Sequence, residues 1–241
     1  MRLLVTRPQP EAAATAAHLV AAGHLVLIDP LLTIEFSPSP AAIQDPAALV
    51  VTSRNAVRAV AGWPIGSAWR PLPVFAVGRE TARALAAAGF VDVRVGPGDA
   101  AALVDFVAVE GRGLAGTILC LRAEEPAVDI AGALGKVGLV ARSIVAYRAV
   151  ASEDLLPATR QALGRGDIDG VLFFSARTAA TFCAIAERTG LAADVVGVRY
   201  FCLSAQVAAP LRALGAARIA VAAEPNAASL QALVAASGSG R

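Results

Sequence analysis

The chain has 241 residues, a formal net charge of +2 and 56% hydrophobic residues, enough apolar material for one large domain or two small ones. The small net charge, the lack of a basic run and an aromatic content of only 5% argue against binding to nucleic acid. No apolar run reaches the roughly 18 residues of a membrane span, and the start MRLLVTRP lacks a signal-peptide pattern. We therefore expect a cytoplasmic protein that does not enter a membrane.

Short apolar runs alternate with alanine- and leucine-rich amphipathic stretches along the whole chain. In chain order the runs occupy residues 3–5, 25–28, 48–51, 74–77, 117–121, 171–174, 200–203 and 219–221. This alternation predicts an α/β fold in which β-α-β units build parallel sheets. Serines that favour helix caps precede three of the helical stretches, at Ser53, Ser175 and Ser204. Glycines stand where helices should end, at positions 23, 89, 138, 190 and 215.

The chain also contains an internal repeat. Arg7 recurs 115 residues later as Arg122, and Gly89 recurs 126 residues later as Gly215. The order of the repeated segments is kept, and the shift grows only by small insertions. Each half thus contains about five strands, which predicts two similar sheets. Because small-molecule sites favour domain interfaces, we expect one ligand to be held between two lobes.

Two organisations are compatible with this repeat. The lobes could be consecutive halves of the chain, or the chain could cross between them twice. Residues 31–40 and 144–153 are extended segments at matching places in the repeat, and both could be linkers. In the crossed organisation, the first lobe combines the N-terminal β-α-β unit with the C-terminal third, and the second lobe is the middle of the chain.

An arginine follows five of the predicted strands. These residues are Arg7, Arg54, Arg79, Arg122 and Arg177. The carboxyl ends of parallel strands form the ligand crevice, where helix N-termini also point their free N–H groups. Guanidinium groups bind carboxylate or phosphate, so the set predicts a site for a multiply anionic small molecule. The alternative is ordinary surface charge, since Lys136 is the only lysine and arginine is the default cation.

Cysteine and histidine give no sign of a metal site. The three cysteines, Cys120, Cys183 and Cys202, lack metal-ligand spacing and are interpreted as small buried hydrophobes in a reducing compartment. The only histidines, His18 and His24, lie away from the predicted strand ends. We therefore expect no zinc site, no Ser-His-Asp triad and no metal at all.

Motifs spread over nearly the whole chain resemble those of the uroporphyrinogen-III synthase family. Their order and spacing carry the resemblance, rather than any single residue. They are Thr6-Arg7-Pro8, Gly23, Pro30, Val51-Thr52-Ser53, Asn55-Ala56-Val57, Ala76-Val77-Gly78, Thr81-Ala82, Tyr147 and Phe173-Phe174-Ser175.

The resemblance implies two similar flavodoxin-like lobes with parallel five-stranded sheets, joined by two extended linkers. It favours the crossed organisation, with residues 1–34 and 148–241 in lobe one, residues 35–147 in lobe two, and linkers near residues 31–36 and 145–150. It also implies a cofactor-free, monomeric lyase. The small-molecule substrate is hydroxymethylbilane, a linear tetrapyrrole polycarboxylate, which is closed to uroporphyrinogen III with ring D inverted through a spiro intermediate and with loss of water.

The resemblance also implies roles for individual residues. Tyr147 aligns with the linker tyrosine of the family, which is proposed to help the hydroxyl group leave as water. Ser53, Thr81 and Ser175 align with hydroxyls of the family's cleft, although helix capping explains such residues equally well. The predicted substrate-binding set is Arg7, Ser53, Arg54, Asn55, Arg79, Thr81, Arg122, Ser175, Arg177 and Ser204.

The chain departs from the family pattern in the segment CLSAQVAAPL. Ser204 replaces a glycine and Val207 replaces a second threonine, which puts a hydroxyl role at position 207 in doubt. Ser204 or Gln206 could substitute for the missing group.

Three other functions remain compatible with the sequence. A two-lobed protein could bind a polyanionic small molecule without turnover, although such proteins usually carry an export signal. A nucleotide-using transferase should show G-x-G-x-x-G after a first strand, or G-x-x-x-x-G-K-[ST], and neither arrangement occurs. The third is an inactive, regulatory member of the family.

Overall fold

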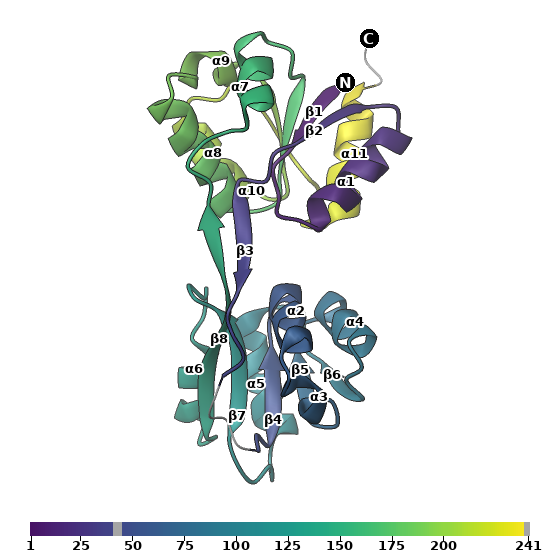
Figure 1. The fold of residues 1–241 in the computed structure, drawn as a ribbon, viewed down its shortest axis with the longest axis vertical. Helices are drawn as coiled ribbons and strands as arrows, with labels where there is room; N and C mark the ends of the chain where they lie inside the picture. Colours follow the sequence, from purple (N-terminus) through teal and green to yellow (C-terminus); the bar gives the residue numbers. More distant parts are fainter. Residues whose placement is uncertain (41–44, 239–241) are drawn as a thin grey trace. The chain divides into compact units, whose positions relative to one another are not determined.

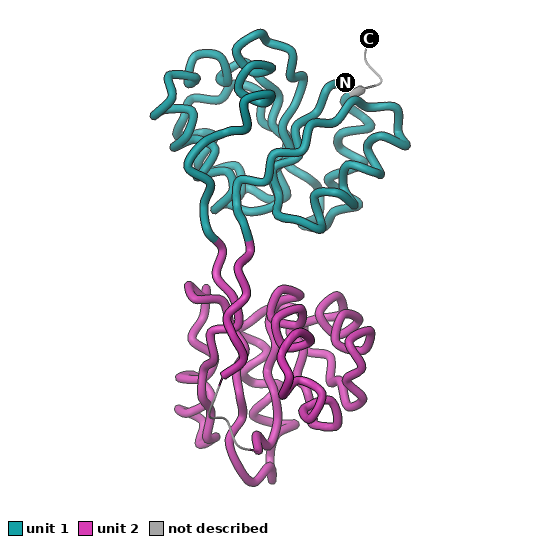
Figure 2. The backbone as a smooth tube through the Cα atoms, in the orientation of Figure 1, with its two compact units in different colours: residues 1–33, 150–241 teal, residues 34–149 magenta. Residues whose placement is uncertain are grey.

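The chain forms two compact units and crosses between them twice. The computed structural model describes residues 1–40 and 45–238 (Figure 1). Unit 1 contains residues 1–33 and 150–241, and unit 2 contains residues 34–149 (Figure 2). Each unit is built around its own sheet.

The sheet of unit 1 has five parallel strands in the order β2-β1-β9-β10-β11. Numbered within the unit, this is the order 2-1-3-4-5 of flavodoxin-like sheets. The elements are β1 (Arg2–Val5), α1 (Glu11–Ala21), β2 (Leu25–Ile28), α7 (Pro157–Gly164), β9 (Gly170–Phe173), α8 (Ala176–Arg188), α9 (Ala192–Val196), β10 (Arg199–Cys202), α10 (Ala205–Ala213), β11 (Arg218–Val221) and α11 (Ala227–Gly238).

The sheet of unit 2 has the order β3-β8-β7-β4-β5-β6, and its strands from β8 to β6 are parallel. Its elements are β3 (Leu32–Phe36), β4 (Ala48–Val51), α2 (Arg54–Gly62), α3 (Gly66–Trp69), β5 (Pro73–Ala76), α4 (Arg79–Ala87), β6 (Asp92–Val95), α5 (Ala100–Glu110), β7 (Ile118–Ala123), α6 (Ile130–Lys136) and β8 (Ala141–Ala151). The strands β3 and β8 contain the two crossing points.

The internal repeat maps onto the two sheets in a crossed manner. The order β8-β7-β4-β5-β6 matches β2-β1-β9-β10-β11 strand for strand. The first two strands of each repeat therefore lie in the same sheet as the last three strands of the other repeat. Consequently, the first two strands of a repeat and its last three strands contribute to different hydrophobic cores.

Both faces of each sheet are covered by helices, which explains why the strands are continuous apolar runs. In unit 1, Leu4 packs with α8 and α10 on one face, and Leu3 packs with α1 and α11 on the other. In unit 2, Leu49 packs with α2 and α4, whereas Val50 packs with α5 and α6. Successive strand residues thus enter opposite cores, as the two-residue period of a strand requires.

The predicted fold class is confirmed, with one correction to the number of strands. Five parallel strands were expected in each sheet, but the sheet of unit 2 has six. The additional strand, β3, pairs with β8. The Ser37 N–H donates to the Ala146 carbonyl at 2.9 Å and the Ser152 N–H donates to the Leu31 carbonyl at 3.0 Å, so the two strands run antiparallel. The backbone N–H and C=O groups of an extended segment need hydrogen-bond partners, and β3 and β8 supply them to each other.

Local signals in the sequence also match the structure. The five glycines expected at helix ends all have positive φ angles, between +74° and +90°. This left-handed conformation is open to glycine but strained for other residues. The three predicted serine caps at Ser53, Ser175 and Ser204 are present as well. Within the described ranges, no helix combines the length and the apolar character needed to cross a membrane.

The crossed arrangement predicts different behaviour for two fragments of similar length. Residues 34–149 contain the whole of unit 2, whereas residues 1–115 comprise one sequence repeat. We expect fragment 34–149 to unfold cooperatively in urea, because its sheet and both of its cores are complete. We expect fragment 1–115 to show no cooperative transition, because β1 lacks β9 and β4 lacks β7. Circular dichroism during urea titration makes the comparison, and a cooperative transition in fragment 1–115 would contradict the arrangement.

Candidate functional site

The strand order of each sheet reverses at one position. In unit 1 the reversal lies between β1 and β9, and in unit 2 it lies between β7 and β4. Ligands of open parallel sheets bind outside the carboxyl ends of the strands at such a point. The helices that follow these strands begin at the same edge and expose N–H donors there. Each sheet therefore presents its own candidate binding surface at its carboxyl edge.

At the edge of unit 1, Arg7 is held in place by its neighbours. Its guanidinium carbon lies 3.9 Å from the centroid of the Phe174 ring, and its Nη1 donates to the Thr15 hydroxyl at 3.3 Å. Arg7 follows β1 and Phe174 follows β9, so the stacked pair spans the reversal of strand order. Stacking on the ring face fixes the plane of the guanidinium, whose N–H donors lie along its edge.

Two further predicted residues of unit 1 are helix caps. The Ser175 hydroxyl accepts from the Thr178 N–H at 3.1 Å and lies 2.7 Å from the Thr178 hydroxyl. The Ser204 hydroxyl accepts from the Val207 N–H at 3.3 Å. Val207, which has no hydroxyl, thus takes part in the cap of α10 through its backbone. Arg177 is exposed in the first turn of α8. Both serines thus order helix starts that face the edge.

At the edge of unit 2, the start of α2 carries three predicted residues. The Ser53 hydroxyl accepts from the Asn55 N–H at 3.0 Å, which caps the helix. The Asn55 side-chain oxygen accepts from Arg58 Nη1 at 2.7 Å, so the amide NH₂ is the group of this side chain that can donate to a ligand. Arg54 is the first residue of the helix and is exposed.

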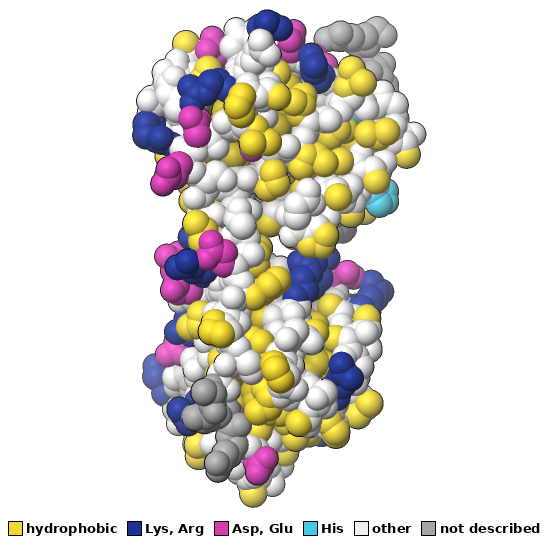
Figure 3. Space-filling view, in the orientation of Figure 1, with side chains coloured by type: hydrophobic (Ala, Val, Ile, Leu, Met, Phe, Trp, Pro, Cys, Tyr) yellow, Lys and Arg dark blue, Asp and Glu magenta, His cyan; other side chains and the backbone are white. Residues whose placement is uncertain are grey.

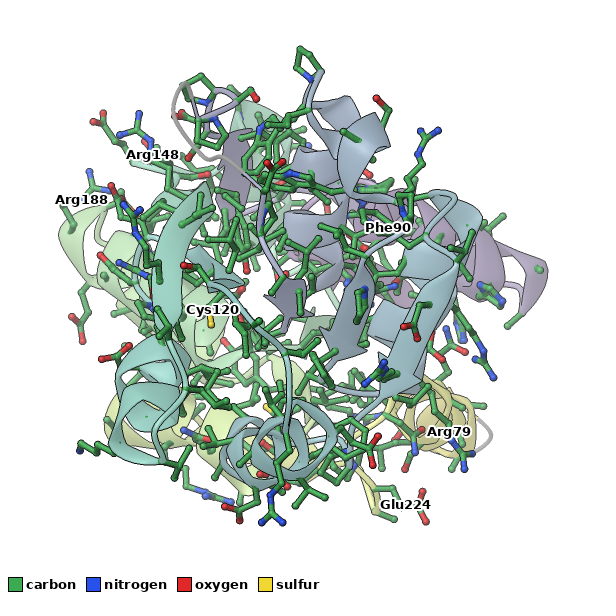
Figure 4. The ribbon with its side chains drawn as sticks, turned by 90° about the horizontal axis from the view of Figure 1, so that it is seen from below. Arg79, Phe90, Cys120, Arg148, Arg188 and Glu224 are labelled. Atoms are coloured by element: carbon green, nitrogen blue, oxygen red, sulfur yellow. The ribbon has the colours of Figure 1, made fainter. Side chains whose placement is uncertain are left out.

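The start of α4 is arranged differently because Gly78 stands at its cap position. Glycine has no side chain, so no side-chain hydrogen bond satisfies the first N–H groups of α4. Arg79 is the first helical residue, and Figure 4 shows it at the periphery of the molecule. Thr81 is 5% exposed, and within the described part of the chain its hydroxyl makes no hydrogen bond. Uncapped N–H groups beside an arginine are suited to an anion.

A pocket of about 260 Å³ lies at the carboxyl edge of unit 2. It brings together three residues that the sequence analysis selected, Ser53, Arg122 and Tyr147, whereas the other predicted residues do not line it. The remaining lining residues are Val50, Thr52, Val77, Ala100, Cys120, Leu121, Ala123, Glu125, Pro126, Ala127, Val128, Ile130 and Ser143.

A bulge in β8 sets the direction of Tyr147. Arg122 pairs with Val145 and Ala123 pairs with Tyr147, so Ala146 is an extra residue in β8. Paired residues of parallel strands point to the same face, and without the extra residue Tyr147 would share the face of Arg122. The bulge places it instead on the face of α2, where it packs against the core below that helix. Bulges often aim a side chain at a site in this way.

Arg122 is partly occupied within its own loop. Its Nη1 donates to the carbonyls of Ala123 and Glu124 at 2.8 and 2.7 Å. These bonds hold the start of the β7–α6 segment, which forms one wall of the pocket. The guanidinium therefore shapes the pocket, and only its remaining N–H groups can bind a ligand.

Charge is distributed unevenly between the two faces of each edge. The helices α2, α8 and α10 have no acidic residue in their first turn, and α4 has only Glu80. On the opposite faces, Asp99 and Asp129 cap α5 and α6, and Glu11 lies in the first turn of α1. Acidic residues neutralise the positive end of a helix, whereas an arginine there adds to it. In Figure 3, cationic side chains gather over α2 and α4. An anion therefore favours the face of α2 and α4 and that of α8 and α10.

The sequence analysis missed part of this site. Glu125 and Ser143 line the pocket, and the acidic caps on the opposite face went unnoticed. Glutamates directly after the strand that ends at Arg122 were a readable signal, because that position belongs to the carboxyl edge. The bulge left no such signal, since nothing in SIVAYR marks an extra residue.

The described residues contain no group of three or more His, Cys, Asp or Glu side chains that could hold a metal ion. Neither histidine lies at a carboxyl edge. His18 contacts the Ala14 carbonyl near the end of α1, and His24 precedes β2, close to the N-terminal amine. The groups available at the edges are hydroxyls, guanidinium groups, carboxylates and backbone N–H groups.

Comparison with known proteins places this geometry in a family. A sequence model of the family described as uroporphyrinogen-III synthase HemD matches residues 13–232. Uroporphyrinogen-III synthetase from Helicobacter pylori is 18% identical, and the alignment covers 98% of this chain and 99% of that chain with a TM-score of 0.67. A mutant uroporphyrinogen III synthase from Thermus thermophilus is 19% identical, with coverages of 99% and 97% and a TM-score of 0.60. No curated protein sequence matches the chain.

The two solved structures show that the fold is shared along the whole length of the chain. The family match spans most of the residues, including the carboxyl ends of all strands at the two edges except β1, and it confirms the family resemblance. The chain therefore belongs to the uroporphyrinogen-III synthase family, the cyclising lyases of porphyrin biosynthesis.

Proposed function

We propose that this chain closes hydroxymethylbilane to uroporphyrinogen III with inversion of ring D and release of water. The observation that carries the proposal is the family match over residues 13–232. The charge at the helix starts supports the proposal, because the substrate is a polycarboxylate and α2, α4 and α8 each carry an arginine in the first turn. Carboxylates bind well to guanidinium groups and to helix N-termini.

The carboxyl edges of both sheets supply the binding groups. In unit 1 these are Arg7, Arg177 and the helix starts capped by Ser175 and Ser204. In unit 2 they are Arg54, Asn55, Arg79 and the helix starts at Ser53 and Gly78, with Thr81 beneath the start of α4. Arg7 is already oriented by Phe174, so less side-chain entropy is lost when a carboxylate binds there. Many donors share the substrate, and no single one is essential.

The chemical step needs positioning more than acid–base strength. Loss of the terminal hydroxyl from the bilane gives an azafulvene, which forms readily because the pyrrole nitrogen donates electrons. The protein must then hold the chain folded so that ring D attacks through its substituted carbon. Orientation of this kind is an effective catalytic device, and it requires only fixed donors and a shaped surface.

Tyr147 is the proposed proton donor to the leaving hydroxyl. The bulge in β8 aims it at the face of α2, and it lines the same pocket as Ser53. A phenol O–H is a hydrogen-bond donor. Departure of water requires one proton, and a donor beside the bound hydroxyl supplies it.

We also propose that the protein is a cytoplasmic monomer. Its three cysteines are buried free thiols, as is usual in a reducing compartment. Each proposed binding group comes from one chain, so a second copy is not needed to complete the set. Light scattering on the purified protein tests the oligomeric state.

Product analysis tests the activity directly. We expect the protein, supplied with hydroxymethylbilane, to give the type III isomer, because the uncatalysed bilane closes without inversion. Separation of the oxidised porphyrin isomers by chromatography measures the ratio. Type I product at the uncatalysed rate, together with measurable binding of the bilane, would instead identify a binding protein without turnover.

Tyr147→Phe should lower kcat for the type III isomer by about 10- to 100-fold, as for the loss of a general acid. KM should change little, because the ring that packs on the core remains. Tyr200→Phe is the matched control, since Tyr200 is fully buried in unit 1 and donates to the Val195 carbonyl at 2.7 Å. That variant should lose stability but keep kcat. An unchanged kcat in Tyr147→Phe would remove the phenol from the chemistry.

Replacing both Arg54 and Arg79 by alanine should raise KM by about fivefold or more per arginine, with a smaller effect on kcat. The folded state should not be weakened by the loss of Arg79, since a cation at a helix N-terminus opposes the helix dipole. Added salt should raise KM of the wild type more than KM of the double variant. The control is Arg112→Ala, because Arg112 follows α5 at the amino-terminal edge of the same sheet. If the double variant kept the KM and the salt dependence of the wild type, the two arginines would be ordinary surface charges without a role in binding.

A further inference from the structure

The pocket at the edge of unit 2 differs in character from the helix starts that attract carboxylates. Its floor and walls are mainly aliphatic, with Val50, Val77, Ala100 and Ile130 among the lining residues. It lies at the carboxyl ends of β4 and β7 and takes lining residues from both faces of the sheet, with Cys120 in the interior on the face of α5 and α6 (Figure 4). A flat apolar group of moderate size suits such a surface better than a carboxylate does.

The rim of this pocket carries one side chain of each charge. Glu125 and Arg122 both line it, and Arg122 Nη1 is already bonded to the carbonyls of Ala123 and Glu124. The capping carboxylates Asp99 and Asp129 stand at the starts of the two helices that supply Ala100 and Ile130. Burial, and then the nearby Asp129 carboxylate, raise the pKa of the Cys120 thiol to about 12. The pocket therefore combines an apolar interior with a carboxylate at its rim, an arrangement that suits an apolar cation.

The proposed reaction passes through a group of this kind. When the hydroxyl leaves, the terminal pyrrole becomes an azafulvenium ring, which is flat, largely apolar and positively charged. Resting on the proposed function, we propose that the pocket of unit 2 binds the pyrrole ring that carries the hydroxymethyl group, and that the Glu125 carboxylate stabilises the positive charge that develops on it. Charge stabilisation by a fixed group at the place where charge develops is an effective source of catalysis.

The step balances with the groups that line the pocket. The C–O bond of the hydroxymethyl group breaks, and its electron pair leaves with the oxygen. The Tyr147 O–H gives the proton that makes the leaving group water. The positive charge stays on the ring beside Glu125 until ring D attacks and a new C–C bond forms. For the inversion, the bond between the attacking carbon of ring D and its original methylene then breaks, and a second C–C bond forms at the unsubstituted carbon of ring D. The proton lost from that carbon restores the tyrosine, so no oxidant or reductant takes part.

The start of α2, next to the pocket, can bind the acetate and propionate groups of the pyrrole ring that the pocket holds. Ser53 lines the pocket and caps α2, and Arg54 is the next residue. A ring seated in the pocket thus has its acidic substituents near a cationic helix start and its ring system near Glu125. This division separates the carboxylates of the substrate from the carboxylate of the protein, which would otherwise repel each other.

The test uses two monopyrroles that both carry an acetate and a propionate. One has an aminomethyl group, which is an ammonium ion at neutral pH, and the other has a methyl group in its place. Titrations into the full-length protein, followed by NMR, give the two affinities. We expect the wild type to prefer the ammonium compound by about fivefold, the upper size of one exposed charge contact. Glu125→Gln should abolish this preference, whereas Glu124→Gln, which changes a neighbouring glutamate that does not line the pocket, should keep it.

A second variant tests the place of binding. Ala127 is exposed on the segment that forms one wall of the pocket, so Ala127→Phe can narrow the pocket without disturbing a core. It should weaken the binding of both monopyrroles. Unchanged binding in this variant, or an ammonium preference that survives Glu125→Gln, would overturn the proposal.

Turnover gives an independent reading. Glu125→Gln should lower kcat about tenfold without raising KM, as for an interaction made only in the transition state. Wild-type kcat in this variant would overturn the role of Glu125. If the wild type makes no type III isomer, the proposed function fails, and the monopyrrole titrations still decide whether the pocket binds a cationic pyrrole.

Discussion

The direction of the strands is the constraint on which the site depends. Because β1, β2 and β9 to β11 run parallel in unit 1, and β4 to β8 do so in unit 2, every carboxyl end of a sheet lies at one edge. The helices that follow start at this edge with their positive ends toward it. The helix starts on the two faces of unit 2 differ. On one face, α2 and α4 have a serine or glycine cap followed by an arginine, whereas on the other face α5 and α6 have an aspartate cap. Placing Arg54 and Arg79 at helix starts opposes a local rule of stability, which is typical of positions kept for function.

In unit 2 this division gives the edge two kinds of surface. The helix starts with arginines suit the carboxylates that make the bilane a polyanion. The apolar pocket with Glu125 at its rim suits the ring system at the moment when it becomes a cation. A substrate that carries negative side chains and reacts through a positive intermediate needs both, and a uniformly basic surface would oppose the reacting state.

Much of the fold could be predicted from the sequence because its signals are local. Apolar runs marked the strands, Ser53 and Ser175 marked helix starts, and Gly23 and Gly215 marked helix ends. The pairing of β3 with β8 could not be predicted, because it joins segments that are distant in the sequence and depends on backbone groups alone. For the pocket, strand-end position was sufficient to select Arg122, and the family resemblance selected Ser53 and Tyr147. The loop bonds of Arg122 and the bulge before Tyr147 depend on register, which residue types do not encode.

The exchange of strands between the two repeats also fixes the order in which the units can be completed during synthesis. The strand β1 is made before the other strands of its sheet, yet it lies between β2 and β9, and β9 follows more than a hundred residues later. Unit 2 is continuous in sequence and emerges from the ribosome as a whole before β9 emerges. Leu3, Leu4 and Val5, all fully buried in the finished unit, must wait for the C-terminal third. The nascent chain therefore carries an apolar strand with one unpaired edge throughout most of its synthesis, a state that favours aggregation and engagement of chaperones.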